Sequence, residues 1–183
     1  MDYFAVIDTE TNWADQVMSI GVVIADEVAM EPVEAKYYIL PTECRIGGMY
    51  ESSLFLETPA QPILCTRTEA LADLCQWLAR YHIQALFAYN ASFDRNHLPE
   101  LRPFVWHDIM RLAAYRQHNP AIPACAEFCT TGRLKRGYGV ETMLRLLRKD
   151  STYRESHNAF FDAVDELQIM ALLGHAPEQY PVL

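Results

Sequence analysis

The stretch Tyr3-Phe4-Ala5-Val6-Ile7-Asp8-Thr9-Glu10-Thr11 decides how the chain folds. Residues 3–7 form an uninterrupted apolar run, which is typical of a strand buried on both faces of a helix-covered sheet. Because side chains alternate along a strand, Asp8 and Glu10 share one face if the strand continues that far. Two neighbouring carboxylates favour a hard divalent cation such as Mg²⁺ or Mn²⁺. The alternative is a polar turn in which both acids are solvated.

Length and composition indicate a single domain with a sizeable core. The chain has 183 residues, 51% of them hydrophobic, and a net charge of −9. We expect one domain over residues 1–174 and a loosely held C-terminal tail over residues 175–183. The acidity argues against a protein that coats duplexes, although a short single strand held by its end needs few phosphate contacts. Because the sequence shows neither a signal-like N-terminus nor a membrane-length apolar run, we expect a cytoplasmic protein without membrane association.

Apolar patterns predict a sheet with helices packed on it. Strands are expected at residues 3–7, 17–24, 36–40, 84–89 and 104–106. The first helix is expected to begin at Thr66, where Glu69 completes a capping box. A second, short helix follows the fourth strand and reaches residue 98. Further helices are expected at residues 108–118, 140–147 and 158–173. Residues 41–62 are expected to be a loop, a candidate flap on the substrate side. A meander followed by alternating strands and helices predicts an α/β fold with a mixed sheet.

Three separated motifs bring acids and a histidine into one order. They are Asp8-Thr9-Glu10, Asn90-Ala91-Ser92-Phe93-Asp94 and His157-Asn158-Ala159-Phe160-Phe161-Asp162-Ala163. Ligand sites in such sheets gather at the carboxyl ends of strands, so Asp94 can approach the first motif there. Asp162 falls on the opening turns of a helix, and His157 lies just before that helix. Imidazole has an ordinary pKa of about 6.5, so it can accept a proton from water near neutral pH.

The order Asp-x-Glu, Asn-x-x-Phe-Asp, His-x4-Asp-Ala resembles the DEDDh 3′→5′ exonucleases, which include the proofreading subunit of bacterial replicative DNA polymerase, ribonuclease T and oligoribonuclease. The resemblance spans about residues 3–173 and includes residues 106–112, which are similar to a strand-to-helix segment of the family. It implies a ribonuclease H-like fold with a five-stranded mixed sheet, helices on both faces, and two divalent ions, Mg²⁺ or Mn²⁺. It also implies a ligand and base set: Asp8, Glu10, Asp94 and Asp162 as metal ligands and His157 as general base.

Several residues near the motifs are candidates for substrate binding. Thr9 and Thr11 can offer backbone or hydroxyl groups to a terminal nucleotide, or they are turn residues. The family often has Thr-Gly after its first acidic pair, whereas this chain has Thr11-Asn12-Trp13. Trp13 can stack on a base or pack on the sheet. Asn90 can orient Asp94 or the substrate, or cap the following turn. We expect Phe93 to lie in the core.

A small basic cluster stands out in this acidic chain. Arg133, Lys135 and Arg136 can bind phosphates upstream of the scissile bond, or they belong to a solvated loop.

The sequence as a whole predicts a metal-dependent 3′→5′ exonuclease that releases nucleoside 5′-monophosphates from single-stranded DNA or RNA. One alternative is a phosphodiesterase for dinucleotides or other small substrates with the same metal centre. Another is a non-catalytic nucleic-acid-binding module on the same fold.

Overall fold

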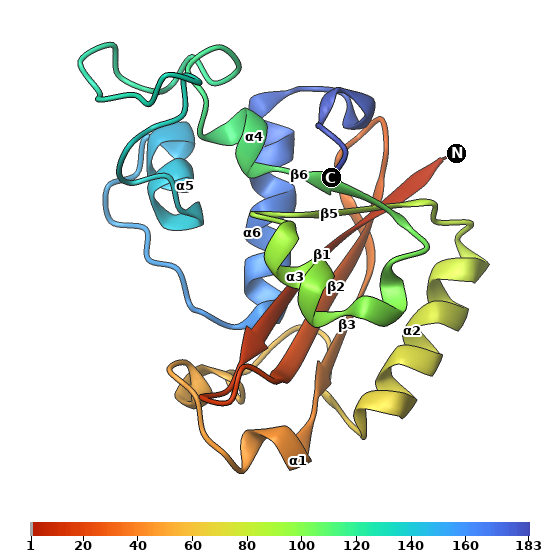
Figure 1. Cartoon of the computed structure of the whole chain (residues 1–183). Helices are drawn as coiled ribbons and strands as arrows, with labels where there is room; N and C mark the ends of the chain where they lie inside the picture. The colour runs from red at the N-terminus through yellow and green to blue at the C-terminus, as the bar shows by residue number, and fades with distance from the viewer. Residues whose placement is uncertain (1) are drawn as a thin grey trace.

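The computed structural model describes residues 2–183 and contains a six-stranded mixed sheet (Figure 1). Its strands are β1 (Tyr3–Thr11), β2 (Val17–Asp26), β3 (Pro32–Ile39), β4 (Ile63–Leu64), β5 (Ala85–Ala88) and β6 (Val105–Asp108), in the spatial order β4-β3-β2-β1-β5-β6. β1, β2 and β3 form an antiparallel meander, whereas β5 pairs with β1 and β6 with β5 in parallel. The predicted mixed α/β sheet is confirmed, but it has six strands and not five. The two-residue β4 is too short to produce a sequence pattern.

The helices follow most of the predicted segments. They are α1 (Pro41–Cys44), α2 (Arg67–Arg80), α3 (Ser92–His97), α4 (Met110–Ala113), α5 (Val140–Arg148) and α6 (Ala159–Leu173), with short 3₁₀ turns at Glu51–Ser53, Pro99–Leu101 and Pro177–Gln179. The capping box at Thr66 is confirmed. The helix expected over residues 108–118 is only the single turn α4. It ends there because the Asn119 side chain donates a hydrogen bond to the Ala113 carbonyl at 2.7 Å and Tyr115 pairs with Arg133.

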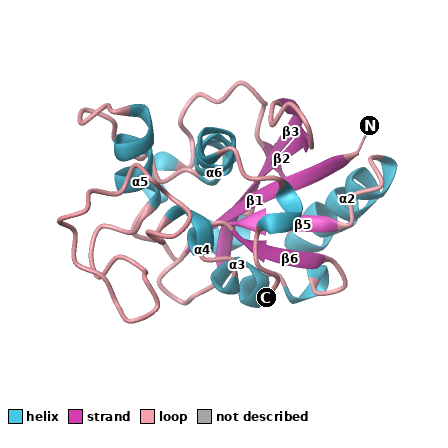
Figure 2. Ribbon diagram, turned by 90° about the horizontal axis from the view of Figure 1, so that it is seen from above, coloured by secondary structure: helices cyan, strands magenta, loops and turns pink. Residues whose placement is uncertain are grey.

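The two faces of the sheet are covered by different helices, as predicted (Figure 2). Ala5 and Ile7 belong to a core cluster that includes the apolar side of α2. Phe4 and Val6 belong to a second cluster that includes residues of α4, α5 and α6. Because side chains alternate along β1, Asp8 and Glu10 continue the face that α6 covers.

A glycine sets how closely α6 approaches the sheet. Gly21 is the cross-strand partner of Asp8, and a Cβ atom at Gly21 would lie 2.0 Å from the carbonyl oxygen of Ala159. Only a residue without a side chain allows the first residue of α6 to lie directly on β2. This contact brings the first turn of α6 beside the acidic end of β1.

Residues 41–62, expected to be an irregular loop, contain α1 and the turn Glu51–Ser53. Leu54 is fully buried, and its carbonyl accepts a hydrogen bond of 2.8 Å from the Tyr37 hydroxyl. The middle of this segment is therefore anchored to β3.

The C-terminal tail is also held more firmly than expected. Tyr180 is buried, the Asp108 amide donates to the Pro181 carbonyl at 3.1 Å, and the Leu183 amide donates to the Trp106 carbonyl at 2.9 Å. These backbone bonds run along the outer edge of β6, which the two prolines of the tail do not prevent. Within residues 2–183, no helix has the length and apolar character needed to cross a membrane.

Candidate active site

The carboxyl end of β1 carries the first group of predicted site residues. β1 continues to Thr11, so Asp8, Thr9 and Glu10 are all strand residues paired with β2. Thr9 and Glu10 are buried and Asp8 is half-buried. The polar turn considered as the alternative is wrong.

Glu10, His157 and Asp162 converge, although they come from opposite ends of the chain. One ligand atom of each residue lies within 4.8 Å of the corresponding atoms of the other two. Glu10 and Asp162 are buried, His157 is half-buried, and Oδ1 of Asp162 has no hydrogen-bond partner. Asp162 occupies the first turn of α6, where Asn158 caps the helix by accepting hydrogen bonds from the amides of Phe160 and Phe161.

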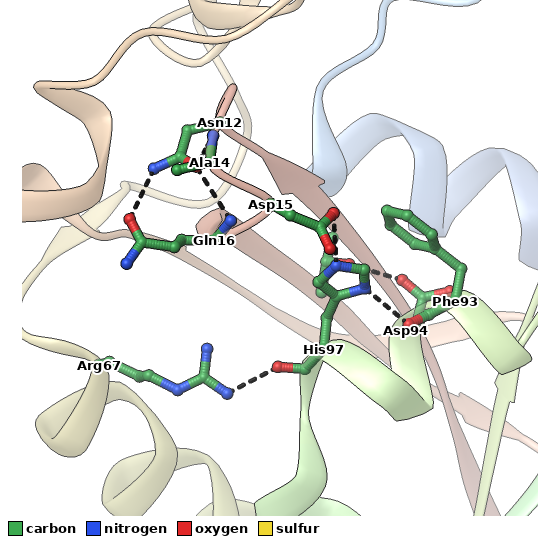
Figure 3. Close-up of polar contacts among 9 residues, drawn as sticks. Asn12, Ala14, Asp15, Gln16, Arg67, Phe93, Asp94 and His97 are labelled. Atoms are coloured by element: carbon green, nitrogen blue, oxygen red, sulfur yellow. Dashed lines mark hydrogen bonds and ion pairs between the residues drawn. The ribbon is translucent and has the colours of Figure 1, made fainter.

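Asp94 reaches the same end of the sheet from α3. It is 1% exposed, and its Oδ1 accepts a hydrogen bond of 2.8 Å from the Thr9 hydroxyl. Figure 3 shows the contacts that hold α3 in place: the His97 ring lies 2.8 Å from the Phe93 carbonyl and 3.0 Å from the Asp15 carboxylate. Arg67 of α2 donates to the His97 carbonyl at 2.7 Å. Thr9 thus holds the Asp94 carboxylate directly, while Asp15 and Arg67 hold the helix that carries it.

Burial raises the pKa of every carboxyl group in this pocket. The pKa of Asp8 lies well above its ordinary value because of burial and then because of repulsion by Asp94 and other neighbouring acids. Burial is also the main cause that raises the pKa of Glu10 and Asp94 to about 7 and that of Asp162 to about 9. Acids packed this closely are stable only when protons or a cation reduce their charge.

Two further acids belong to this pocket and were missed from the sequence. Glu166 is 2% exposed and accepts a hydrogen bond of 3.0 Å from the Tyr89 amide. Its pKa is raised well above the ordinary value by burial and then by Asp94. Glu155 is half-buried, and burial raises its pKa to about 6. The spacing of Asp162 and Glu166, one helical turn apart, was the available signal, because it places both on one side of α6.

His157 lies at the edge of the pocket with unusual surroundings. Its backbone has a φ of 52°, in the left-handed region. Its imidazole stacks on the ring of Tyr50, with ring centroids 3.9 Å apart and an interplanar angle of 18°. Burial lowers the pKa of His157. Tyr50 was not among the predicted site residues.

A cavity of about 400 Å³ adjoins the acids. Trp13, Met49, Tyr50 and Phe93 contribute its large apolar side chains, next to Thr9, Glu10 and Thr11. Trp13 is 67% exposed, so the alternative that it packs on the sheet is wrong. Phe93, expected in the core, is 40% exposed because it occupies the outer side of the short helix α3.

The remaining predicted residues lie outside this group. Asn90 has a φ of 60°, and its backbone N–H donates a hydrogen bond to the Asp108 carboxylate at 3.1 Å. It does not cap α3 with its side chain, because the N-cap is Ala91 and carries no side-chain bond. The proposed role of Asn90 as a helix cap is therefore wrong.

The basic cluster lies in a loop that projects beyond α4 and α5, away from the end of β1 (Figure 1). Arg133 lies 4.6 Å from the ring of Tyr138, and Arg136 pairs with Glu127 at 3.8 Å. Lys135 is exposed. Over residues 2–183, no hydrogen bond or ion pair connects these three side chains to the acidic pocket.

Comparisons with known proteins find solved structures of similar fold but no similar sequences. No family model matches the chain, and no curated protein sequence is significantly similar to it. Among solved structures, the nuclease domain of 3′hExo, a DEDDh family member bound to rAMP, has a TM-score of 0.66 at 14% identity over 100% of this chain and 96% of that one. A full-length 3′-exonuclease has a TM-score of 0.67 at 15% identity, with 99% of this chain and 63% of that one covered.

E. coli Exonuclease I in complex with a dT13 oligonucleotide is a further neighbour. Its TM-score is 0.61 at 13% identity, and the match covers 98% of this chain and 42% of that one. At such low identity the likeness is one of fold. The predicted fold is thereby confirmed: the chain has the ribonuclease H-like α/β fold of DEDDh exonuclease domains.

Proposed function

We propose that the protein is a metal-dependent 3′→5′ exonuclease that acts on single-stranded DNA or RNA ends in the cytoplasm. The observation that carries this proposal is the convergence of Glu10, His157 and Asp162, with one ligand atom of each within 4.8 Å of the others. Asp94 is bonded to Thr9 beside Glu10, and Asp8 precedes both on the same strand. The fold shared with 3′-exonucleases supports the same reaction class.

The donor set fits divalent cations. Its members are carboxylates, which hard ions such as Mg²⁺ and Mn²⁺ prefer, and Oδ1 of Asp162 is buried without a partner. Burial is the main cause of the raised pKa values of Asp8, Glu10 and Asp94, and repulsion by neighbouring acids adds to it at Asp8 and Glu10. Asp8, Glu10, Asp94 and Asp162 would hold two such ions. When bound, paired ions stabilise the charge on the attacking and leaving oxygens of a displacement at phosphorus.

His157 is the residue that would take the proton from the attacking water. Its lowered pKa keeps the imidazole neutral at pH 7, so that one ring nitrogen is free to accept. As the water oxygen bonds to phosphorus, the bond to the 3′ oxygen of the preceding nucleotide breaks. The products are a nucleoside 5′-monophosphate and a strand shortened by one unit.

The cavity beside the acids would receive the terminal nucleotide. Trp13 and Phe93 offer exposed rings on which an unpaired base can stack, and Thr9 and Thr11 provide polar groups next to them. Arg133, Lys135 and Arg136 would at most bind phosphates further upstream, because they lie in the loop beyond α4 and α5.

A second candidate function is supported by the charge of this cavity. Its lining contains Glu10 and Asp15 but neither lysine nor arginine. A long strand would gain little electrostatic attraction there. This favours a phosphodiesterase for dinucleotides or other short substrates with the same centre.

Digestion of 5′-labelled oligonucleotides tests both candidates. DNA and RNA of graded length, including dinucleotides, are incubated with Mg²⁺ or Mn²⁺ and, as a control, with a chelator. We expect stepwise, metal-dependent shortening from the 3′ end. Cleavage confined to the shortest substrates would favour the phosphodiesterase. Binding without cleavage of any substrate would contradict both and favour a binding module.

A further inference from the structure

The imidazole of His157 is positioned by ring stacking and not by hydrogen bonds. The Tyr50 ring lies parallel to it, with centroids 3.9 Å apart. Across residues 2–183, no protein group forms a hydrogen bond with either ring nitrogen. A general base is usually oriented by a hydrogen bond to its second nitrogen. Stacking leaves both nitrogens, which lie in the plane of the ring, free for water and substrate.

The backbone of His157 needs support as well. Its φ of 52° lies in a region that side chains with a Cβ atom disfavour. The hydroxyl of Ser53 contacts the His157 carbonyl oxygen and lies 2.7 Å from the carbonyl of Tyr50. The Ser53 hydroxyl therefore connects the backbones of Tyr50 and His157, whose rings stack on each other.

The segment that carries Tyr50 is tied to the start of α6. The Asn158 side-chain amide donates to the Ser53 carbonyl at 2.7 Å and to the Tyr37 hydroxyl at 3.0 Å. The Tyr37 hydroxyl donates in turn to the Leu54 carbonyl at 2.8 Å. These groups are buried, so the bonds are shielded from water. The cap of α6 and residues 50–54 thus form one unit.

We propose that Tyr50 is a positioning residue for His157 and that residues 50–54 hold it in place. This inference depends on the proposed function, because it assigns Tyr50 to the orientation of the base in that reaction. It gives residues 41–62 a role on the catalytic side of the pocket. Tyr50 does not exchange protons in this role, and its ring alone is required.

The competing role for Tyr50 is to stack on a substrate base, since it also lines the cavity with Trp13. The two roles predict different kinetics. A misplaced base slows the chemical step and leaves substrate binding unchanged, whereas a lost stacking partner for substrate raises KM. Trp13 is exposed and has no ring contact with His157, so it provides the comparison for substrate stacking.

The test measures kcat and KM for Tyr50→Ala, Tyr50→Phe, Trp13→Ala and Phe55→Ala. For Tyr50→Ala we expect kcat to fall about ten- to hundredfold with KM almost unchanged. Tyr50→Phe retains the ring and should restore kcat. Trp13→Ala should raise KM instead. Phe55→Ala changes an exposed residue of the same segment and should behave as the unaltered protein. Circular dichroism and thermal melting confirm that each variant is folded.

The NMR spectrum of the His157 ring gives a readout that does not depend on turnover. Loss of the Tyr50 ring current should shift the His157 ring protons in Tyr50→Ala and not in Phe55→Ala. Unchanged kcat in Tyr50→Ala, a rise in KM alone, or an equal loss in Tyr50→Phe would overturn the inference. An inactive unaltered protein would overturn the proposed function too, whereas an active one with unaffected Tyr50→Ala would overturn only this inference.

Discussion

The acidic pocket (Asp8, Glu10, Asp94, Glu155, Asp162 and Glu166) and the basic loop (Arg133, Lys135 and Arg136) carry charges of opposite sign. They also differ in how far their side chains are buried. Asp94 and Asp162 lie on helices packed against the sheet, and each is at most 3% exposed. Arg136 lies in an extended loop with its side chain 88% exposed, paired with Glu127, which is itself 65% exposed. Buried charges are constrained and strongly coupled, whereas exposed ones are screened by water and salt. We therefore expect steep effects from the pocket and shallow ones from the loop.

The largest effect should come from Asp162→Asn, which keeps the shape of the side chain and removes its charge. We expect kcat to fall by about a thousandfold, because a lost ligand weakens the charge stabilisation that the cations supply. Single-turnover kinetics at saturating metal measure the change. Glu31→Gln, at an exposed acid in the turn between β2 and β3, is the matched control. A loss of less than tenfold would remove Asp162 from the ligand set.

A smaller effect is expected from Glu166→Gln. The amide oxygen of glutamine can still accept the Tyr89 amide, so the fold is retained while the negative charge is removed. We expect the metal concentration for half-maximal activity to rise by about ten- to hundredfold, with kcat at saturation little changed. Activity measured across a metal titration tests this. An unchanged titration would mean that Glu166 is protonated at the working pH and contributes no charge.

The pocket should also govern how stability depends on pH in the absence of metal. The pKa values of Glu10 and Asp94 are raised to about 7 and that of Asp162 to about 9. The folded state therefore binds protons more tightly than the unfolded state, so this stabilisation is full at low pH and is lost as pH rises from about 4 to about 9.

Thermal melting in a chelator should accordingly show a decrease of more than about 5 °C across that range. Added Mg²⁺ or Mn²⁺ should reduce the decrease, because a cation replaces the missing protons. The basic loop does not enter this balance, so Arg136→Ala should leave the pH profile unchanged. A melting temperature that rises with pH in the chelator would contradict the raised pKa values.

The smallest effect should come from the loop itself. For Arg133→Ala and Arg136→Ala we expect KM to rise less than about threefold and the salt dependence of KM to weaken, with kcat unchanged. KM measured for a long oligonucleotide at several salt concentrations tests this, with a dinucleotide as the control substrate. A tenfold rise in KM for the long oligonucleotide would show that the loop contacts the strand as closely as the pocket does.

The parts that the sequence predicts are those whose signals are local. The apolar run before Asp8, the capping box at Thr66 and the helix that follows His157 each depend on neighbouring residues. The order of the three motifs then placed Asp94 and Asp162 correctly beside the end of β1. Short-range pattern and strand polarity were sufficient for this much.

The parts that it does not predict depend on tertiary packing. Glu166 was missed because a helical stripe is read from apolar residues, and the buried face of α6 also contains acids. Tyr50 was missed because its contact with His157 joins an irregular segment to a distant one. Phe93 was assigned to the core because its character is apolar, although the buried residue of α3 is Asp94 and Phe93 lies on the outer side of this helix.

The left-handed backbone of His157 sets folding and turnover against each other at one position. Glycine is the residue that adopts a φ of 52° most readily, so His157→Gly should relieve strain while it removes the imidazole. A selection for thermal stability alone would favour this replacement, and a selection for nucleotide release would reject it. The position is therefore one where a more robust protein would be an inert one.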